Sequence, residues 1–548
     1  MTTSIAAPRT QRPGAVGGGA GDPERRLPEV DELEMKARVR EILNRWPTVG
    51  LAVGVVRNGS LEFFHGHGVA DIASNTPITE DTVFRIGSIT KTFTAIAVMQ
   101  LWERGLVDLD APANDYLRAF RLIPAKPSFR PATVRHLLTH TAGVPEWVRP
   151  SQMVRSGWFG ETYPLGVRLP TLAEFYRGGL RLAVEPGTTF TYTDHGIAVL
   201  GQIVEDLSGT PLDRYFREEI FEPLGMEDTD LLRSKRLESR LARGYRLRAA
   251  GPKPLTDRQG VTAAAGSIYS TPRDMARYLA ALLGGGANEH GSVLKPETLA
   301  TMFEPHYQPD PRIPGMGLAF WRADLGGHRA VEHQGIVPGF NSQIFLAPDE
   351  GVGVMGFTNG ARNAVIWLTA ETGGLLRHLI GVPDEVIRTD VPHRPEVWGE
   401  ICGWYGARAQ PTDMMAWSWM GAGARVVVRR GRLMLRALSP IPALYRGVVL
   451  HPDDEHDPYV FRIDLSEHGM GTAKVVFGRE AGAGTTAHLE MPPLTLVKRP
   501  ASKSPRLWIT GALAGAATAM AVGRRRKARY QRRSGLLNDR RGTERRGP

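Results

Sequence analysis

The sequence lacks the features that would place it in a disulfide-bonded, zinc-binding or classically secreted class. Its 548 residues include a single cysteine, Cys402, so no intramolecular disulfide can form, and no Cys and His spacing resembles a structural zinc site. Residues 1–27 lack the basic start and apolar run of a secretory signal peptide and have the composition of a disordered leader. These absences predict a fold that depends on packing, and a cytoplasmic or membrane-associated location without classical export.

Net positive charge is small outside the last residues of the chain. The net charge is +11, but the segment 523–548 holds eleven Arg and Lys and two acidic residues, a net of +9, so only +2 remains for the rest. The folded body therefore lacks the basic surface of a nucleic-acid-binding protein, and nucleic acid is an unlikely partner. The basic tail, 524–548, is expected to be disordered and could contact anionic lipid headgroups.

No apolar run is clearly long enough for a membrane span. The longest candidate, Leu507–Val522, has sixteen uncharged residues, fewer than the roughly 20 that a spanning helix needs, and many are Ala, Gly or Thr. We expect an apolar helix over 501–523, and three interpretations stay open. It is a weak membrane anchor, an amphipathic surface helix or a helix packed on its own protein.

Hydrophobic periodicity predicts an α/β (α+β) unit over residues 28–382. Residues 31–47 have helical spacing, and two β-rich runs flank Asn58-Gly59, a strong hairpin signal. Within 85–105 apolar residues recur every three to four positions, which predicts an amphipathic, central helix that ends at Gly105. Strand patterns return over 330–360. This order predicts an antiparallel sheet flanked by helices, with an all-helical region beside it.

The remaining sequence predicts a second, smaller unit. Residues 383–395 are rich in Pro and charge and have the character of a linker, and short strand patterns with turns follow over 396–500. We expect a small β domain there and find no catalytic pattern in it.

Two residues in the predicted central helix have the spacing of a catalytic pair. Ser88 and Lys91 lie three residues apart and share one helical face, so the amine can reach the hydroxyl. A serine becomes a nucleophile when a base takes its proton, and a desolvated lysine can serve. Alone, the pair is better explained by a serine that caps a helix and a lysine on its surface.

Two later motifs favour the catalytic interpretation. The stretch "EPGTTFTYTDHG" contains Tyr192 and Asp194, and "EHQGIVPGF" contains His333 and Gly335. They follow Ser88 in the order in which penicillin-recognising serine enzymes carry their second and third motifs. Six phrases in this order carry the resemblance: "FRIGSITKTFTA", "RHLLTHTAGVP", "PGTTFTYTDHGIAVLG", "PLGMEDT", "AAAGSIYSTPRDMARYL" and "HQGIVPGFNS".

From about residue 43 to 380 the chain resembles the serine β-lactamase-like, or penicillin-binding, superfamily, closest to its class C β-lactamase, D-aminopeptidase and esterase members. The resemblance implies an α/β sandwich and an acyl-enzyme mechanism with no metal or organic cofactor. It implies that Ser88 is the nucleophile, with Lys91 and Tyr192 moving its proton. It also implies an oxyanion hole formed by the backbone N–H groups of Ser88 and Ile336, and substrate contacts from Asp194, His333 and Gly335.

Two positions depart from the family pattern. Asp194 replaces the usual Asn, and a carboxylate, which only accepts hydrogen bonds, would keep Lys91 protonated or favour a substrate that carries an amine. His333 stands where β-lactamases carry a lysine and supplies positive charge poorly at neutral pH. We therefore rank small carboxylic esters first as substrates, D-amino-acid peptides or amides second and β-lactams, as for a β-lactamase or DD-peptidase, third. A binding or regulatory protein with weak catalysis is the alternative.

Other residues have weaker claims. His136 and His140 have the spacing of a metal pair, but no zincin glutamate accompanies them, so structural roles are preferred. We expect the acidic loop His451–Pro458 to be a solvated connection between strands. We expect Glu185 to brace a loop. The aromatic residues Trp102, Trp147, Trp158 and Phe175 are expected in the core, with a substrate wall as the alternative.

Overall fold

The computed structural model describes residues 30–148, 162–408, 413–421, 423–480, 482, 484–490, 492–500 and 502. The predictions for the leader, for Leu507–Val522 and for the basic tail fall outside these residues, as does Trp158. Within them no helix is both long and apolar enough to cross a membrane.

A seven-stranded antiparallel sheet forms the centre of the first unit in the part of the chain that the structure describes. Its spatial order is β12 (Trp321–Leu325), β13 (His328–Val337), β14 (Phe340–Ala347), β15 (Val352–Thr358), β1 (Gly50–Arg57), β2 (Ser60–Asp71) and β3 (Thr76–Pro77). Because β1 pairs with β15 in the register Leu51↔Thr358, strands from both ends of the unit join in one sheet. This arrangement confirms the predicted antiparallel sheet, and Asn58 and Gly59 form the predicted hairpin turn with positive φ.

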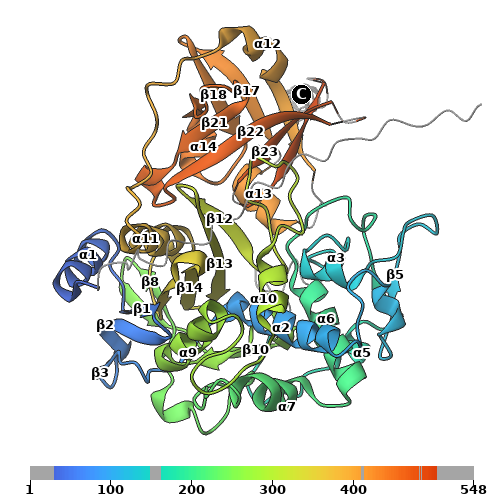
Figure 1. Cartoon of the computed structure of the whole chain (residues 1–548), viewed down its shortest axis with the longest axis vertical. Helices are drawn as coiled ribbons and strands as arrows, with labels where there is room; N and C mark the ends of the chain where they lie inside the picture. Colours follow the sequence, from blue (N-terminus) through green and yellow to red (C-terminus); the bar gives the residue numbers. More distant parts are fainter. Residues whose placement is uncertain are drawn as a thin grey trace, which may run out of the picture.

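Helices cover both faces of this sheet (Figure 1). On one face α1 (Glu32–Arg45) and α11 (Ala364–Leu379) pack against strand residues that include Leu51 and Val53. On the other face lies the helical region: α2 (Thr90–Glu103), α3 (Val134–Leu138), α5 (Leu172–Phe175), α6 (Asp194–Ser208), α7 (Leu212–Phe216), α8 (Ala263–Gly266), α9 (Pro272–Leu283) and α10 (Pro296–Phe303). Asp31 caps α1 by accepting from the N–H groups of Leu33 and Glu34.

Short strand pairs complete the helical region. They are β4 (Phe84–Arg85) with β11 (Tyr269–Ser270), β5 (Leu122–Ile123) with β7 (Leu180–Arg181), β6 (Thr162–Pro164) with β10 (Arg258–Gly260), and β8 (Tyr245–Arg248) with β9 (Gly251–Pro254). The β4 strand leads directly into the segment that carries Ser88.

The central helix differs from its prediction in one respect. Helix α2 lies in the core and ends near Gly105, whose φ of 69° suits a helix terminus, as expected. It is not amphipathic, because every residue from Thr90 to Leu101 is buried, including the polar Lys91. The prediction of an amphipathic helix is therefore wrong. The cause is that α6, α8 and α9 pack around α2, so its polar side chains pair internally instead of facing water.

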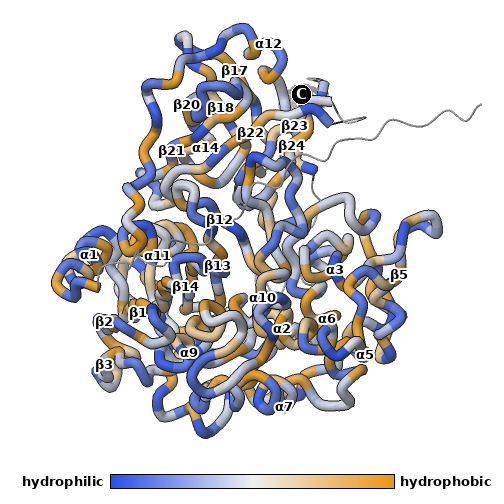
Figure 2. The backbone as a smooth tube through the Cα atoms, in the orientation of Figure 1, coloured by the Kyte–Doolittle hydropathy of each residue, from blue (hydrophilic) through white to orange (hydrophobic). Residues whose placement is uncertain are grey.

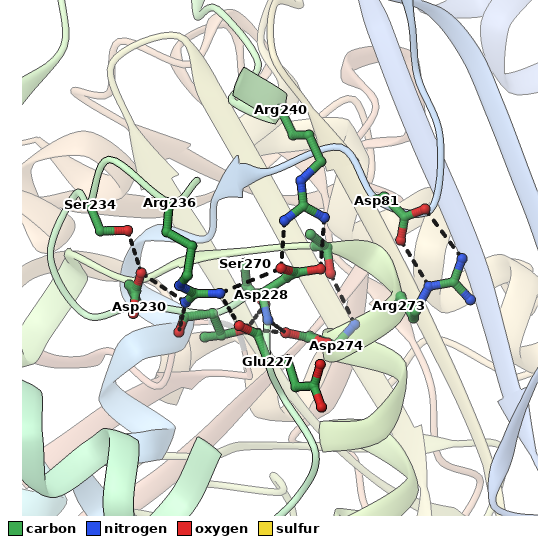
Figure 3. Close-up of polar contacts among 12 residues, drawn as sticks. Asp81, Glu227, Asp228, Asp230, Ser234, Arg236, Arg240, Ser270, Arg273 and Asp274 are labelled. Carbon is green, nitrogen blue, oxygen red and sulfur yellow. Dashed lines mark hydrogen bonds and ion pairs between the residues drawn. The ribbon is translucent and has the colours of Figure 1, made fainter. Parts of the chain in front are cut away.

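An ion-pair network joins the segment 227–240 to the first turn of α9 (Figure 3). Asp228 pairs with Arg240, and the buried Asp274 accepts hydrogen bonds from the backbone N–H of Asp228 and from Thr229. Burial raises the pKa of Asp274 to about 6. Thr271 caps α9 and Pro272 occupies its first turn, as predicted. These contacts explain two of the six sequence phrases by structure rather than catalysis.

The second unit is a nearly closed antiparallel barrel, nine-stranded over the residues described here. Its order is β19 (Val448–Val449), β18 (Arg432–Ala437), β17 (Ala424–Arg429), β16 (Gly403–Ala407), β24 (Thr495–Arg499), β23 (Gly484–Leu489), β22 (Thr472–Glu480), β21 (Val460–Asp464) and β20 (His451–Pro452). The first and last strands of this order are neighbours in sequence, so the sheet's ends meet near residue 450. Hydrophobic and hydrophilic residues alternate along its strands (Figure 2).

Three short helices accompany the barrel strands: α12 (Trp398–Ile401), α13 (Met414–Met420) and α14 (Pro442–Arg446). Figure 1 shows α13 on the side of the barrel that faces the first unit. Met415 packs there against a cluster of Phe190, Met316 and Trp321 from the first unit. The barrel therefore reaches the region of Tyr192, which belongs to the same cluster.

Candidate active site

Ser88 lies on a tight turn and not at a helix cap. It is the middle residue of a 3₁₀ turn, Gly87–Ile89, between β4 and α2. The residue in the cap position of α2 is Ile89, and no side chain forms a capping hydrogen bond there. Ser88 itself stays partly exposed and lines a cavity. The interpretation of Ser88 as a simple helix cap with a surface lysine is therefore wrong.

Lys91 is fully buried in the first turn of α2 and makes three hydrogen bonds. Its Nζ donates to Ser88 Oγ at 2.9 Å, to Asp194 Oδ1 at 2.6 Å and to the Ala265 carbonyl at 2.8 Å. An ammonium group has three donors, so the protonated side chain is completely satisfied. Burial lowers the pKa of Lys91, but the Asp194 carboxylate and Tyr192 outweigh it and raise the pKa above its ordinary value. Lys91 is a cation in this arrangement.

Tyr192 joins this pair from the loop before α6. The Lys91 Nζ lies 4.8 Å from the centre of the tyrosine ring, and the ring stacks on Trp321 at 5.8 Å. Burial raises the pKa of Tyr192, and its interactions with Lys91 and Ser88 oppose that shift without reversing it. The side chain is therefore a neutral phenol that can donate a proton.

Asp194 is the first residue of α6, so its carboxylate sits at the positive end of that helix. Its side chain is 27% exposed while that of Lys91 is 0% exposed, so the ion pair connects the core to the cavity. The sequence predicted this contact between the unusual aspartate and the lysine, and the structure confirms it.

His333 lies on β13 with its side chain buried. Its Nδ1 is 2.7 Å from the Gln334 carbonyl, which can only accept, so Nδ1 carries the proton and Nε2 presents a lone pair. No described residue hydrogen-bonds to Nε2. Burial and the Lys91 charge lower the pKa of His333 to about 3. The side chain is a neutral acceptor and cannot replace the charge of a lysine.

Two glycines bring β13 against the serine turn. A Cβ added to Gly87, whose φ is 55°, would lie 2.6 Å from the Ile336 nitrogen. One added to Gly335 would lie 1.9 Å from the Ile86 carbonyl oxygen. Glycine is required at both positions because only a backbone without a side chain permits this approach. The segments that carry the Ser88 and Ile336 N–H groups are therefore adjacent.

His140 was expected from the sequence to have only a structural role. It has a φ of 55°, unusual for a residue with a side chain, and its ring lies 4.5 Å from that of Tyr192. The Thr193 N–H donates to its Nδ1 at 3.3 Å, so Nε2 carries the proton. His140 thus supports the loop that carries Tyr192.

Glu146 is a residue of the site that the sequence did not predict. It lines the cavity with Ser88, Tyr192 and Asp194, and its Oε2 is buried without a partner among the described residues. Burial and the neighbouring Asp194 raise the pKa of Glu146 well above its ordinary value. No motif marks this position; only its place after the "HTAGVP" loop could have suggested it.

The weaker candidates resolve as structural features. His136 completes a capping box with Thr133, and Glu185 pairs with Arg130 at 3.1 Å, as a loop brace should. No group of three potential metal ligands occurs in the described ranges. In the loop 451–458, Asp457 pairs with Arg312.

The aromatic stripe does not form a substrate wall. Phe175 is in the core and Trp102 is exposed, and neither these two nor Trp147 line the cavity. The aromatic residues that do line it are Trp46, Trp321, Trp419, Tyr192 and Phe345.

The residues matched by a known family cover more than half of the chain. The family described as Beta-lactamase matches residues 35–378. The chain belongs to the beta-lactamase family. This match includes Ser88, Lys91, Tyr192, Asp194, His333 and Ile336 and ends before the barrel.

The names of known relatives of this beta-lactamase-family chain state different activities. An unguisins hydrolase from Aspergillus campestris is 28% identical over 332 residues, 58% of this chain and 59% of that protein. Esterase EstB from Burkholderia gladioli is 33% identical over 238 residues, 42% of this chain and 59% of that protein. The chain thus spans about three fifths of each of these relatives.

Among solved structures, the octameric penicillin-binding protein homologue from Pyrococcus abyssi has a TM-score of 0.55 at 24% identity. The match covers 86% of this chain and 100% of the other, which shows a shared fold that extends beyond the family region.

Proposed function

We propose that this protein is a serine hydrolase that forms an acyl-enzyme on Ser88, with carboxylic esters as its preferred substrates. The observation that carries the proposal is the 2.9 Å contact between Ser88 Oγ, at the cavity, and the buried Lys91. A hydroxyl on a tight turn with a lysine, a tyrosine and paired backbone N–H groups around it has the parts that acyl transfer needs.

Each residue then has a role. In the molecules whose Lys91 is a neutral amine, Ser88 Oγ attacks the substrate carbonyl carbon and its proton passes to Lys91. The N–H groups of Ser88 and Ile336 bind the oxyanion. Tyr192 gives its phenolic proton to the leaving alcohol and takes a proton from Lys91 in return, which restores the neutral amine. Water then repeats these steps on the acyl-enzyme and releases the acid.

The preference for esters rests on His333. A β-lactam or a peptide with a free C-terminus brings a carboxylate, and a neutral acceptor with a pKa of about 3 offers it neither charge nor a hydrogen-bond donor. Gly335 keeps the β13 backbone close to the turn. The name of the esterase relative is consistent with this ranking.

A second candidate is hydrolysis of amides or peptides that carry an amine. The Asp194 carboxylate reaches the cavity beside Lys91, and the Glu146 carboxyl there, whose raised pKa favours its neutral form, can accept a hydrogen bond from a substrate ammonium group.

The test combines labelling and turnover. A fluorophosphonate probe should label the wild-type protein and fail to label Ser88→Ala, and p-nitrophenyl acetate should turn over faster than D-amino-acid amides or nitrocefin. Faster turnover of the amides would favour the second candidate, and faster turnover of nitrocefin would refute the ranking. Absence of labelling and of turnover in a folded wild-type protein would indicate a binding protein instead.

A further inference from the structure

The cavity that contains Ser88 is larger than the catalytic residues require. Its volume is about 1370 Å³, whereas sites for small ligands usually measure roughly 300–1,000 Å³. On one side of Ser88 it is lined by polar residues near β6 and β10, including Asp257 and Arg258. On the other side it continues between the first unit and the barrel.

The interdomain part is mainly apolar along its length. Near Ser88 it is lined by Trp321 and by Met415 of α13, which pack in one cluster with Tyr192. Trp419 and Ile441 of the barrel also line it. At the far end, the barrel loop around Gly469 meets Trp46 and Trp367, so the cavity ends between α1, α11 and that loop.

Charged side chains at the far end pair with one another. Arg45 contacts Glu371 at 2.8 Å, and Arg377 lies 3.4 Å from Glu385. Glu41, Asp384 and Glu467 also line the cavity. The apolar surface between the charged groups favours hydrocarbon.

We propose that this interdomain part of the cavity holds a long apolar group of the substrate, so that the enzyme prefers esters with an extended hydrocarbon chain. The inference rests on the proposed function, because the cavity is continuous with Ser88. Transfer of each methylene from water to such a lining accelerates the reaction by a factor of up to about four if the gain is realised in the transition state.

One glycine allows the cavity to be filled without disturbing the core. Gly374 lies on α11 and lines the cavity, and an added Cβ there would meet nothing within 4 Å. Gly374→Phe should therefore occupy the far end. Ala370→Phe, one turn earlier on the same lining face, gives an independent second variant.

A matched control is available in the barrel. Gly399 lies on α12, also has open space at its Cβ position and does not line the cavity. Gly399→Phe makes the same chemical change outside the proposed site.

The experiment measures kcat/KM for p-nitrophenyl esters from acetate to octanoate, and for acetate esters of alcohols from butanol to octanol. We expect kcat/KM to rise at least roughly tenfold with chain length in one series, which shows whether the acyl or the alcohol part occupies the cavity. Gly374→Phe and Ala370→Phe should remove most of this rise and keep acetate turnover, and Gly399→Phe should keep the rise.

Each outcome separates the inference from the proposed function. Acetate turnover that depends on Ser88, with no rise in either series, would overturn the inference alone, as would a rise that both filled variants retain. Octanoate binding to Ser88→Ala, measured by calorimetry, gives a readout without turnover. Binding that is abolished when Gly374→Phe is added to Ser88→Ala supports the inference. No octanoate binding to Ser88→Ala contradicts it. Loss of Ser88-dependent turnover of every ester would overturn the proposed function.

Discussion

The two folded units contribute to one cavity in different ways. The first unit buries a lysine in its core and aligns Ser88, Tyr192 and Asp194 around it. The barrel buries a core of apolar side chains and adds α13 and residues from three further segments (440–442, 465–473, and Glu490 with Pro492) to the wall. The difference suggests a division between chemistry and access. Changes at Ser88, Lys91 and Tyr192 should affect every substrate, and changes in the barrel should affect only large ones.

The largest effect should come from Lys91→Met. This change keeps a long side chain in the core but removes the group that accepts the Ser88 proton, so kcat/KM should fall by about 10²–10⁴-fold for all esters alike. Steady-state rates on acetate and octanoate measure it, and a thermal melt checks folding. A loss of kcat/KM that depends on ester length would contradict the expectation that Lys91 acts on all substrates equally.

The next effect concerns pH. Asp194 raises the pKa of Lys91, so the neutral amine is scarce at neutral pH and activity should increase as pH rises. Asp194→Asn removes the carboxylate and lowers the pKa of Lys91, so the acid limb of the kcat/KM profile should move to lower pH. Because the fraction of neutral amine sets the rate on this limb, lowering the pKa of Lys91 by one should raise the rate at pH 7 by about tenfold.

Profiles for acetate between pH 5 and 10 test this change, and Asp206→Asn, on the same helix but outside the cavity, is the control. An unmoved acid limb would show that Lys91 is not the base that limits the rate.

In the barrel, Met415→Ala should affect only extended substrates. Removing this side chain strips apolar contact from the cavity wall, so KM for octanoate should rise by roughly three- to tenfold while kcat and the acetate rates stay unchanged. Val428→Ala, an exposed position of the barrel outside the cavity, should leave both esters unaffected. An equal loss on acetate would place Met415 in the chemical step.

The smallest effect on rate should come from Asp413→Asn, which acts on stability. Burial raises the pKa of Asp413 to about 6, so the folded state binds this proton more tightly than the unfolded chain does. Its stabilising contribution is complete below about pH 4 and is lost as pH rises through about 6, by up to about 3 kcal/mol.

Urea unfolding at pH 4 and pH 8 should therefore show a smaller pH dependence for Asp413→Asn than for the wild type. The Asn side chain still accepts from the Ala416 N–H, so helix α13 keeps its cap. Equal pH dependence in both proteins would show that this carboxyl group does not contribute.

The elements that the sequence predicted well carry local signals. The Asn58-Gly59 hairpin and the cap at Thr271 follow from residues that are close together in the chain. The Ser88–Lys91 contact is of the same kind, because three residues of helical spacing determine it.

What the sequence did not predict depends on contacts between distant segments. Helix α2 has no exposed polar face because α6, α8 and α9 pack around it. Glu146 enters the site, and the aromatic residues of the wall come from β12, β14 and the barrel, through packing that no motif encodes. The tautomer of His333 likewise follows only from the position of the Gln334 carbonyl.

Because α2 is buried, we expect the enzyme to stay active only while its core stays packed. Lys91 reaches Ser88 from a helix that has no exposed residue before Trp102, so the site cannot loosen by itself while the interior stays packed. Heat inactivation and melting of the first unit should then be one event. Residual activity thus reports directly on the fraction of molecules that remain folded.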